Sequence, residues 1–301
     1  MKAFKWIAVV IIFLTTLTST TSARGNHKDK AQLAYNQGNY ETALALWKKT
    51  IAKYEKRDKG TRCTVYAKAG MAALKLGQED EARELFEKAI YSASVSPKAY
   101  LELAKLYRKI NNLSLEIDVL EKYVKKYPSE KEIIPMQERL FATYVKSENW
   151  EEALNLWKKL PATFTKNLTN KTAFLKVNIA LNKKEVSNKL ASDILKSDPK
   201  NITALDWEAK RYFWRAENRY QSELKAYNKN KTRSQYAELL RAFKVVTVDF
   251  KKSLGYFRKL YALQPTSENA LFLGNTYARL NNKSKAKYYH NLADKLKKEG
   301  K

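Results

Sequence analysis

Side chains that could carry out catalysis or hold a metal are scarce in this chain. Its 301 residues include two histidines, His27 and His290, and one cysteine, Cys63, while its eight glycines form no phosphate-binding cluster. A zinc site needs three or four suitably spaced ligands, and a nucleophilic thiol needs an imidazole to activate it. Because these three residues lie far apart in the sequence, we expect a protein that is not an enzyme and needs no metal, cofactor or small-molecule substrate.

Positive charge is the most prominent chemical property of the chain. It carries 58 Lys and Arg against 31 Asp and Glu, a formal net charge of +27 at pH 7. Such a surface attracts polyanions, including acidic envelope polymers, anionic lipid headgroups, acidic proteins and nucleic acid. The alternative is that a lysine-rich surface serves solvation alone.

A ladder of regularly spaced positions organises the rest of the sequence. Its rungs lie 39, 34, 37, 34, 34, 32 and 33 residues apart. They are Ala43, Ala82, Glu116, Ala153, Ser187, Gln221, Ser253 and Ala286. Around them an aromatic or aliphatic residue returns three before and four after, with a helix-breaking Gly, Asn or Glu five before. This long-range periodicity predicts a repeat array.

Each repeat has room for two helices of about three turns joined by tight turns, which is too little to bury a core of its own. Neighbouring repeats must therefore stack. A small residue is favoured at the rung, where two helices cross closely, and the large residues around it lie on the same helix face. Glu116 and Gln221 depart from this rule, which indicates either looser crossings or a register shifted by one or two residues.

The repeats resemble those of tetratricopeptide-repeat (TPR) proteins over nearly all of residues 27–297. The last repeat follows the family's order L-G-x-x-Y…A…F…A, with Leu273, Gly274, Tyr277, Ala286, His290 and Ala293. The second repeat has Tyr66, Ala69, Gly70, Gly77, Ala82, Phe86 and Ala89. The resemblance implies an all-α, right-handed superhelical solenoid of about eight TPR-like helix pairs.

The sixth repeat departs most from the pattern. Its aromatic residues lie out of register, and residues 228–232 (NKNKT) form a polar break. We therefore expect an N-terminal array of five repeats at residues 24–200 and a C-terminal array of three degenerate repeats at residues 201–301. We also expect the curvature of the superhelix to change at this break.

The first 23 residues have the pattern of an export signal. Lys2 and Lys5 precede an apolar run at residues 6–17, and small residues follow at positions 21–23. The run is shorter than the roughly 20 residues needed to span a bilayer, so a retained anchor is the weaker alternative. We expect a signal peptide at residues 1–23 and an exported protein, periplasmic or extracellular, of a bacterial cell envelope, with no membrane span after cleavage.

The resemblance also implies where a partner binds. In the family, first helices line the concave face, and their positions not used for packing read the ligand. By register these positions are Lys105, Arg108, Lys109, Lys176, Lys210, Phe213, Trp214, Arg241, Lys244, Asn275 and Arg279. They predict a basic groove with an aromatic wall, suited to an acidic extended peptide. Packing is the alternative role for Trp214, and plain solvation is the alternative for the lysines.

Two functions fit these features. The first is a non-catalytic interaction scaffold of the cell envelope, which holds a peptide or protein in the groove. The second is a polyanion-binding envelope protein driven by net charge, whose affinity falls steeply with salt; nucleic acid is the least expected of its ligands. A sensor module acting with a separate signalling protein is a third, weaker possibility.

Overall fold

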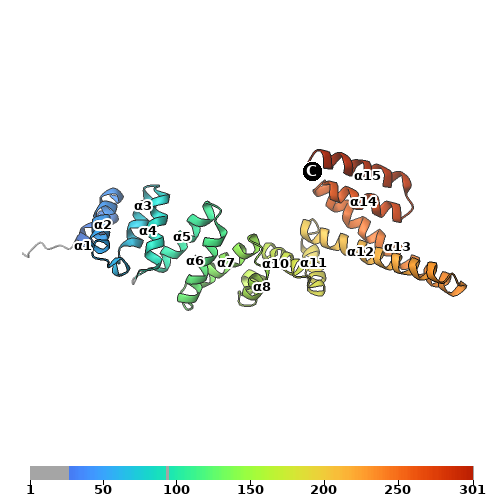
Figure 1. Ribbon diagram of the computed structural model, residues 1–301, viewed down its shortest axis with the longest axis horizontal. Coiled ribbons are helices and arrows are strands. Elements are labelled where there is room, and N and C mark those ends of the chain that lie inside the picture. Colours follow the sequence, from blue (N-terminus) through green and yellow to red (C-terminus); the bar gives the residue numbers. More distant parts are fainter. Residues whose placement is uncertain (1–26, 93–94, 301) are drawn as a thin grey trace, which may run out of the picture. The chain divides into compact units, whose positions relative to one another are not determined.

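The computed structural model describes residues 27–92 and 95–300, and regular structure in these ranges is helical (Figure 1). The signal peptide expected at residues 1–23 lies outside the described residues. The chain divides into two compact units, Met1–Leu106 and Tyr107–Lys301. Within the described ranges, none of the helices combines the length and hydrophobicity that crossing a bilayer requires.

Between residues 27 and 197, the chain consists of short helices joined by short connecting segments. The first unit contains α1 (His27–Asn36), α2 (Tyr40–Glu55), the 3-10 turn η1 (Gly60–Arg62), α3 (Tyr66–Lys75), α4 (Glu79–Ile90) and the start of α5 (Pro97–Lys109). The second unit continues with α6 (Leu113–Lys126), α7 (Ile133–Lys146), α8 (Trp150–Trp157), α9 (Ala162–Thr165), α10 (Leu168–Ala180) and α11 (Lys184–Ser197). It ends with α12 (Ile202–Lys229), α13 (Arg233–Leu263), α14 (Ser267–Arg279) and α15 (Lys283–Lys298).

Six tight turns join a first helix to the second helix of its pair. The middle residue of each turn lies two positions after the first helix ends and has a positive φ between 53° and 80°. These residues are Gly38, Gly77, Asn111, Glu148, Asn182 and Asn281. Gly and Asn tolerate this left-handed conformation best, which is why they end helices so often. All six lie five positions before a rung, so the turns predicted by the repeat pattern are confirmed.

The last third of the chain departs from the expected two short repeats between residues 201 and 263. One pair of long helices, α12 and α13, takes their place, so seven successive helix pairs are described instead of about eight. Ala216 and Val248 occupy the two breaker positions there. Alanine is the best helix former, and valine strongly resists a positive φ, so neither residue can end a helix in the left-handed turn. The polar segment at residues 228–232 instead supplies the turn between the long helices.

The rungs show which parts of the ladder form close helix crossings. Seven of them are buried, with at most 7% of the residue exposed: Ala43, Ala82, Glu116, Ala153, Ser187, Ser253 and Ala286. Gln221 is exposed on α12, where its side chain donates to Glu217 over 2.8 Å. Gln221 is therefore the one position of the ladder where a repeat was expected but the residue is not buried at a helix crossing.

Glu116 keeps its rung position although it is not small. Its carboxylate has no exposed surface and accepts a hydrogen bond from Nε of Arg139 at 2.9 Å. Nε of Arg108 lies 3.1 Å from the same carboxylate, and Nη2 of Arg108 donates to the hydroxyl of buried Thr143 over 2.9 Å. The rung is thus filled by a carboxylate held between two guanidinium groups, and the register needs no shift.

A continuous apolar core holds the end of the second unit together. Phe213 on α12, Phe250 and Phe257 on α13 and Leu273 on α14 are all at most 4% exposed and belong to one packed cluster. A second cluster joins Leu175, Ala191 and Ile194 to Ala204 of α12, so packed side chains run across residue 200. The division of the repeat array at that residue stays a prediction.

Candidate functional site

The first helices α12 and α14 contact each other through aromatic side chains. The rings of Phe213 and Phe272 meet edge to face with their centres 5.1 Å apart, and the Trp214 ring also meets Phe272 edge to face, at 6.1 Å. Phe213 is only 4% exposed, whereas half of Trp214 is exposed. Phe213 therefore belongs to the core and fixes the spacing of the two helices, and Trp214 supplies the accessible aromatic surface.

A pocket of about 430 Å³ lies where these helices meet. Its lining consists of Phe213, Trp214, Glu217, Asn275, Ala278 and Arg279. We call it the α12–α14 pocket. Four of these residues were predicted as ligand-reading positions from the register, and the structure brings all four together.

One wall of the α12–α14 pocket is a bidentate ion pair. Nε of Arg279 lies 2.7 Å from Oε2 of Glu217, and Nη2 of Arg279 donates to Oε1. Burial disfavours the ionised carboxylate, but the hydrogen bonds from Arg279 and Gln221 outweigh that effect and lower the pKa of Glu217. The predicted cation is therefore present but already matched by an acid, and the wall is polar without being strongly positive.

A close approach of α14 and α15 positions the part of the pocket lined by Asn275. A Cβ on Gly274 would overlap the ring of His290 on α15, so glycine is what allows the ring to lie against α14. Nε2 of His290 lies 3.0 Å from Oδ1 of Asn275. Because an amide oxygen only accepts, His290 donates this hydrogen bond, which leaves the amide group of Asn275 as a donor for a ligand.

Lys210 lies one helical turn before Trp214 and is also matched by acids. Its Nζ atom is 2.9 Å from both Asp206 and Glu268, and it lies 5.8 Å from the centre of the Phe272 ring. Burial disfavours the charged form of Lys210, but the two hydrogen bonds outweigh that effect and raise its pKa. A second pocket, of about 410 Å³, includes this ion cluster.

The remaining predicted residues are not among those that line the α12–α14 pocket. Lys105 pairs with Glu102 at 3.0 Å, and the guanidinium of Arg108 is engaged by Glu116 and Thr143. Lys109 on α5 and Lys176 on α10 are exposed. Arg108 thus has a structural contact where ligand binding was predicted.

Arg241 and Lys244 were assigned to a first helix that does not form. Both are exposed on α13, the second helix of the long pair, and Arg241 lies 3.2 Å from Glu238. The error has the same origin as the missing turn at Val248, because without that turn the chain continues as one helix.

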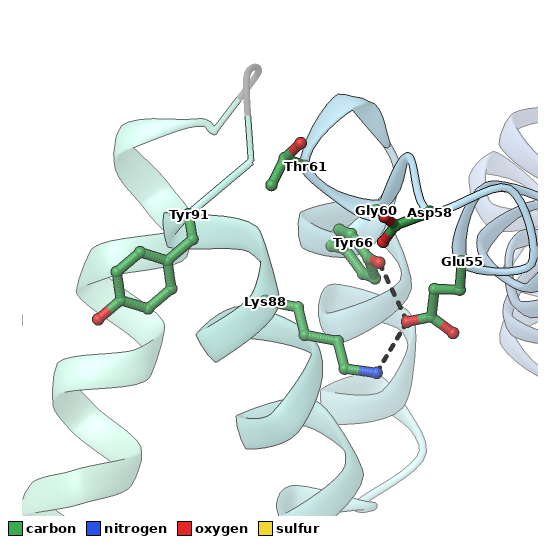
Figure 2. A pocket seen from close by; sticks show the side chains of 7 residues that line it. All are labelled: Glu55, Asp58, Gly60, Thr61, Tyr66, Lys88 and Tyr91. Carbon is green, nitrogen blue, oxygen red and sulfur yellow. Dashed lines mark hydrogen bonds and ion pairs between the residues drawn. The ribbon is translucent and has the colours of Figure 1, made fainter.

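The first unit contains a separate pocket of about 400 Å³ (Figure 2). Figure 2 shows the hydroxyl of Tyr66 and Nζ of Lys88 both reaching Oε1 of Glu55, at 3.1 and 2.9 Å. The hydrogen bond from Lys88 lowers the pKa of Glu55 although burial opposes it, and burial together with the hydrogen bond to Glu55 raises the pKa of Tyr66. These groups satisfy one another, so we regard this pocket as the weaker candidate.

Some residues of the site carried no sequence signal. Glu217 and Arg279 are 62 positions apart, and only the packing of α14 on α12 shows that they pair. Ala278 is exposed at the pocket and is small, which leaves the space open. Across the described ranges, no three His, Cys, Asp or Glu side chains come close enough to hold a metal ion.

Comparison with known proteins connects the helix pairs to one repeat class. Residues 34–169 match the family model described as Psidin, N-terminal TPR repeats region. No curated protein matches the chain.

Several solved structures are similar to it at low identity. A putative protein binding protein from Bacteroides ovatus is 15% identical with a TM-score of 0.49, covering 62% of this chain and 98% of that one. YrrB, a TPR protein with an unusual peptide-binding site, is 16% identical with a TM-score of 0.44, covering 60% and 89%. The C-terminal part of a TPR repeat-containing protein from Cytophaga hutchinsonii is 15% identical with a TM-score of 0.46, covering 89% and 94%.

Proposed function

Since the chain is a tetratricopeptide-repeat protein, we propose that it is a non-catalytic interaction scaffold that holds a peptide segment of a partner protein in the α12–α14 pocket. The single observation that carries the proposal is the half-exposed ring of Trp214 at an open pocket on two first helices. Exposed tryptophan is uncommon on surfaces without a partner and is enriched where partners bind.

The chemistry of the pocket suits an extended peptide. Trp214 offers apolar contact area, and the amide of Asn275 donates to a peptide carbonyl oxygen. The ion pair of Glu217 and Arg279 can exchange hydrogen bonds with polar groups of the ligand without leaving a buried charge unpaired. Because Lys210 and Arg279 are matched by acids, we assign shape and backbone recognition to this pocket instead of charge attraction.

Pull-down from an extract of the source cells tests the proposal with two pocket variants. Ala278→Trp fills the space and Trp214→Ala removes the apolar wall, so both should lose the partner that the unchanged chain retains. Tyr288→Ala is the matched control, because Tyr288 on α15 is 61% exposed and lies outside the pocket. Retention of the partner by both pocket variants would contradict the proposal.

The polyanion alternative is tested by salt. Capture through net charge falls steeply between low and physiological salt and does not discriminate among polyanions, because it depends on counterion release. Capture through the pocket should persist at physiological salt and should not be displaced by heparin or nucleic acid. The opposite result would favour the polyanion-binding function.

We also propose that the protein acts outside the cytoplasm, in a bacterial cell envelope. The support is the charged, apolar and small-residue pattern of residues 1–23. N-terminal sequencing of the protein recovered from its source should start at Arg24. A chain that still starts at Met1 and fractionates with the cytoplasm would contradict this proposal.

A further inference from the structure

The long pair α12 and α13 continues beyond the end of α14. The last residue of α14, Arg279, pairs with Glu217 and lies 4.6 Å from the centre of the Tyr220 ring. From Tyr220 the helix α12 runs on to Lys229 before the chain turns into α13. Figure 1 shows this hairpin end extending past α14 and α15. We call residues 219–248 the hairpin tip.

An aromatic and aliphatic stripe follows α13 along the hairpin tip. Tyr236, Leu240 and Phe243 are spaced four and three residues apart and so share one helix face. Tyr236 is 49% exposed and Leu240 is 45% exposed. Aromatic pairs join the stripe to α12, because Phe243 stacks on Tyr220 at 5.3 Å and Tyr236 meets Tyr227 at 5.7 Å.

The stripe continues a surface that α14 covers nearer the core. There Phe272 of α14 stacks on Phe257 of α13 at 4.8 Å and meets Phe213 of α12 at 5.1 Å. Tyr220 links the two regions, since one ring contacts both Arg279 at the end of α14 and Phe243 in the stripe. Beyond that point α14 has ended, and the apolar face is left open.

Charge indicates what kind of partner covers this face. The hairpin tip contains seven Lys and Arg against two Glu, a net charge of +5. Arg241 is matched by Glu238. The other six have no acidic partner among the described residues: Arg219, Lys225, Lys229, Lys231, Arg233 and Lys244. The tip thus holds the unmatched positive charge that the sequence led us to expect in the groove.

A second copy of this chain is a poor occupant, because it would bring another tip of the same sign against the first. An acidic partner neutralises the lysines and arginines, and a partner with its own apolar stripe covers the aromatic face. A helix meets both needs when it carries apolar residues three and four positions apart and carboxylates beside them. The platform formed by two packed helices matches the surface on which α14 already lies.

We propose that the hairpin tip binds an acidic amphipathic helix of a partner protein, which lies on α12 and α13 in continuation of α14. This surface adjoins the α12–α14 pocket at Arg279 but shares no lining residue with it, and the proposal goes beyond the peptide binding assigned to that pocket. The lysines and arginines attract and orient the helix, while the stripe of Tyr236, Leu240 and Phe243 supplies the apolar contact.

Fluorescence anisotropy with the full chain and a labelled synthetic peptide tests this proposal. The probe is an 18-residue helix with Leu and Phe at positions i, i+3, i+4 and i+7 and Glu at most others. A peptide of the same composition in scrambled order has the same charge without the stripe. We expect the ordered peptide to bind at least tenfold more tightly than the scrambled one at 150 mM salt. Equal binding of both peptides would overturn the proposal.

Two sets of variants locate the binding surface. Replacing Lys225, Lys229, Lys231 and Arg233 by Glu should weaken binding at least tenfold, whereas the same change at exposed Lys158, Lys159, Lys183 and Lys184 should weaken it less than threefold. The pair Tyr236→Ser and Leu240→Ser should also weaken binding at least tenfold. Its control is the pair Leu271→Ser and Tyr288→Ser. Leu271 is 46% exposed and Tyr288 is 61% exposed, and both lie outside the hairpin tip.

Other outcomes would contradict the proposal. If the four Glu substitutions at the tip and the four control Glu substitutions weakened peptide binding equally, the peptide would be held by general attraction to positive charge. Tip-dependent binding to vesicles of phosphatidylglycerol and phosphatidylcholine, with no binding of the ordered peptide, would mean a lipid surface. Far-UV circular dichroism confirms that each variant folds. Ala278→Trp should leave peptide binding at the tip unchanged, so failure here is distinct from failure of the pocket function.

Discussion

The Nε atom of Arg139 lies 2.9 Å from Oε1 of Glu116, a carboxylate with no exposed surface at a position where the repeat favours alanine. Arg108 approaches the same carboxylate, so two cations share one anion. A buried charge is tolerated only when it is paired and hydrogen-bonded. This cluster therefore replaces the close packing of a small residue with an ion network between neighbouring helices.

Removing Glu116 should destabilise the second unit strongly. Glu116→Ala leaves a cavity and removes the buried carboxylate that the partly exposed guanidinium groups of Arg108 and Arg139 contact, so we expect a loss of about 2–4 kcal/mol in the free energy of unfolding. Urea denaturation followed by circular dichroism measures it. Glu238→Ala removes an exposed pair with Arg241 and should cost less than about 0.5 kcal/mol. Equal effects of the two substitutions would contradict the role assigned to Glu116.

Two helical glycines should respond to alanine in opposite directions. A Cβ on Gly274 would overlap the His290 ring, whereas a Cβ on Gly255 in α13 meets no atom within 4 Å. Gly255→Ala should stabilise the fold by about 0.5–1 kcal/mol through helix propensity. Gly274→Ala should destabilise it by about 1–3 kcal/mol through overpacking. Thermal melts of the two variants check this, and stabilisation by both would show that the ring is not packed against Gly274.

The ion pair of Glu217 and Arg279 should make stability depend on acid pH. The pKa of Glu217 in the folded chain lies below its ordinary value of 4.5. A carboxylate of this kind stabilises the fold above its unfolded pKa, and the contribution disappears as the pH falls through the folded pKa. The difference in unfolding free energy between the unchanged chain and Glu217→Gln should be full at pH 7 and should shrink below about pH 4.5.

Urea denaturation at several pH values measures this difference. Arg279→Gln removes the same pair but leaves Glu217, whose pKa burial then raises, so the difference between the unchanged chain and this variant should also shrink as the pH falls. The unfolding free energies of the unchanged chain and Glu217→Gln could instead differ by the same amount at every pH between 7 and 3. That result would show that the pair does not stabilise the ionised carboxylate.

The repeat pattern predicted most of the fold because its signals are local. A residue able to adopt a positive φ, such as Gly77 or Asn281, marks the end of a first helix wherever it occurs. The long helices could have been recognised by the same rule, since Ala216 and Val248 fall at breaker positions and neither ends a helix. The spacing of the ladder alone does not distinguish a turn from a continuous helix, whereas the identity of the residue at the turn does.

The candidate site was less accessible to sequence reasoning. Register placed Trp214 and Asn275 correctly on first helices, because helical periodicity decides which face a residue occupies. Register could not show that Arg279 is matched by Glu217 or that Arg108 contacts Glu116, since such pairs depend on side chains brought together by packing. The basic groove was predicted from the lysines and arginines that the register places on first helices, whereas the local charge depends on which of them pair with acids.

Site-specific photocrosslinking tests the central claim, that the α12–α14 pocket is the partner surface, most directly. Benzoylphenylalanine in place of Trp214 reacts with whatever lies against that wall, and the same residue in place of Tyr288 samples an equally accessible position outside the pocket. We predict a crosslinked partner at position 214, lost when Ala278→Trp is added, and none at position 288. A partner captured at position 288 and absent at position 214 would contradict the account.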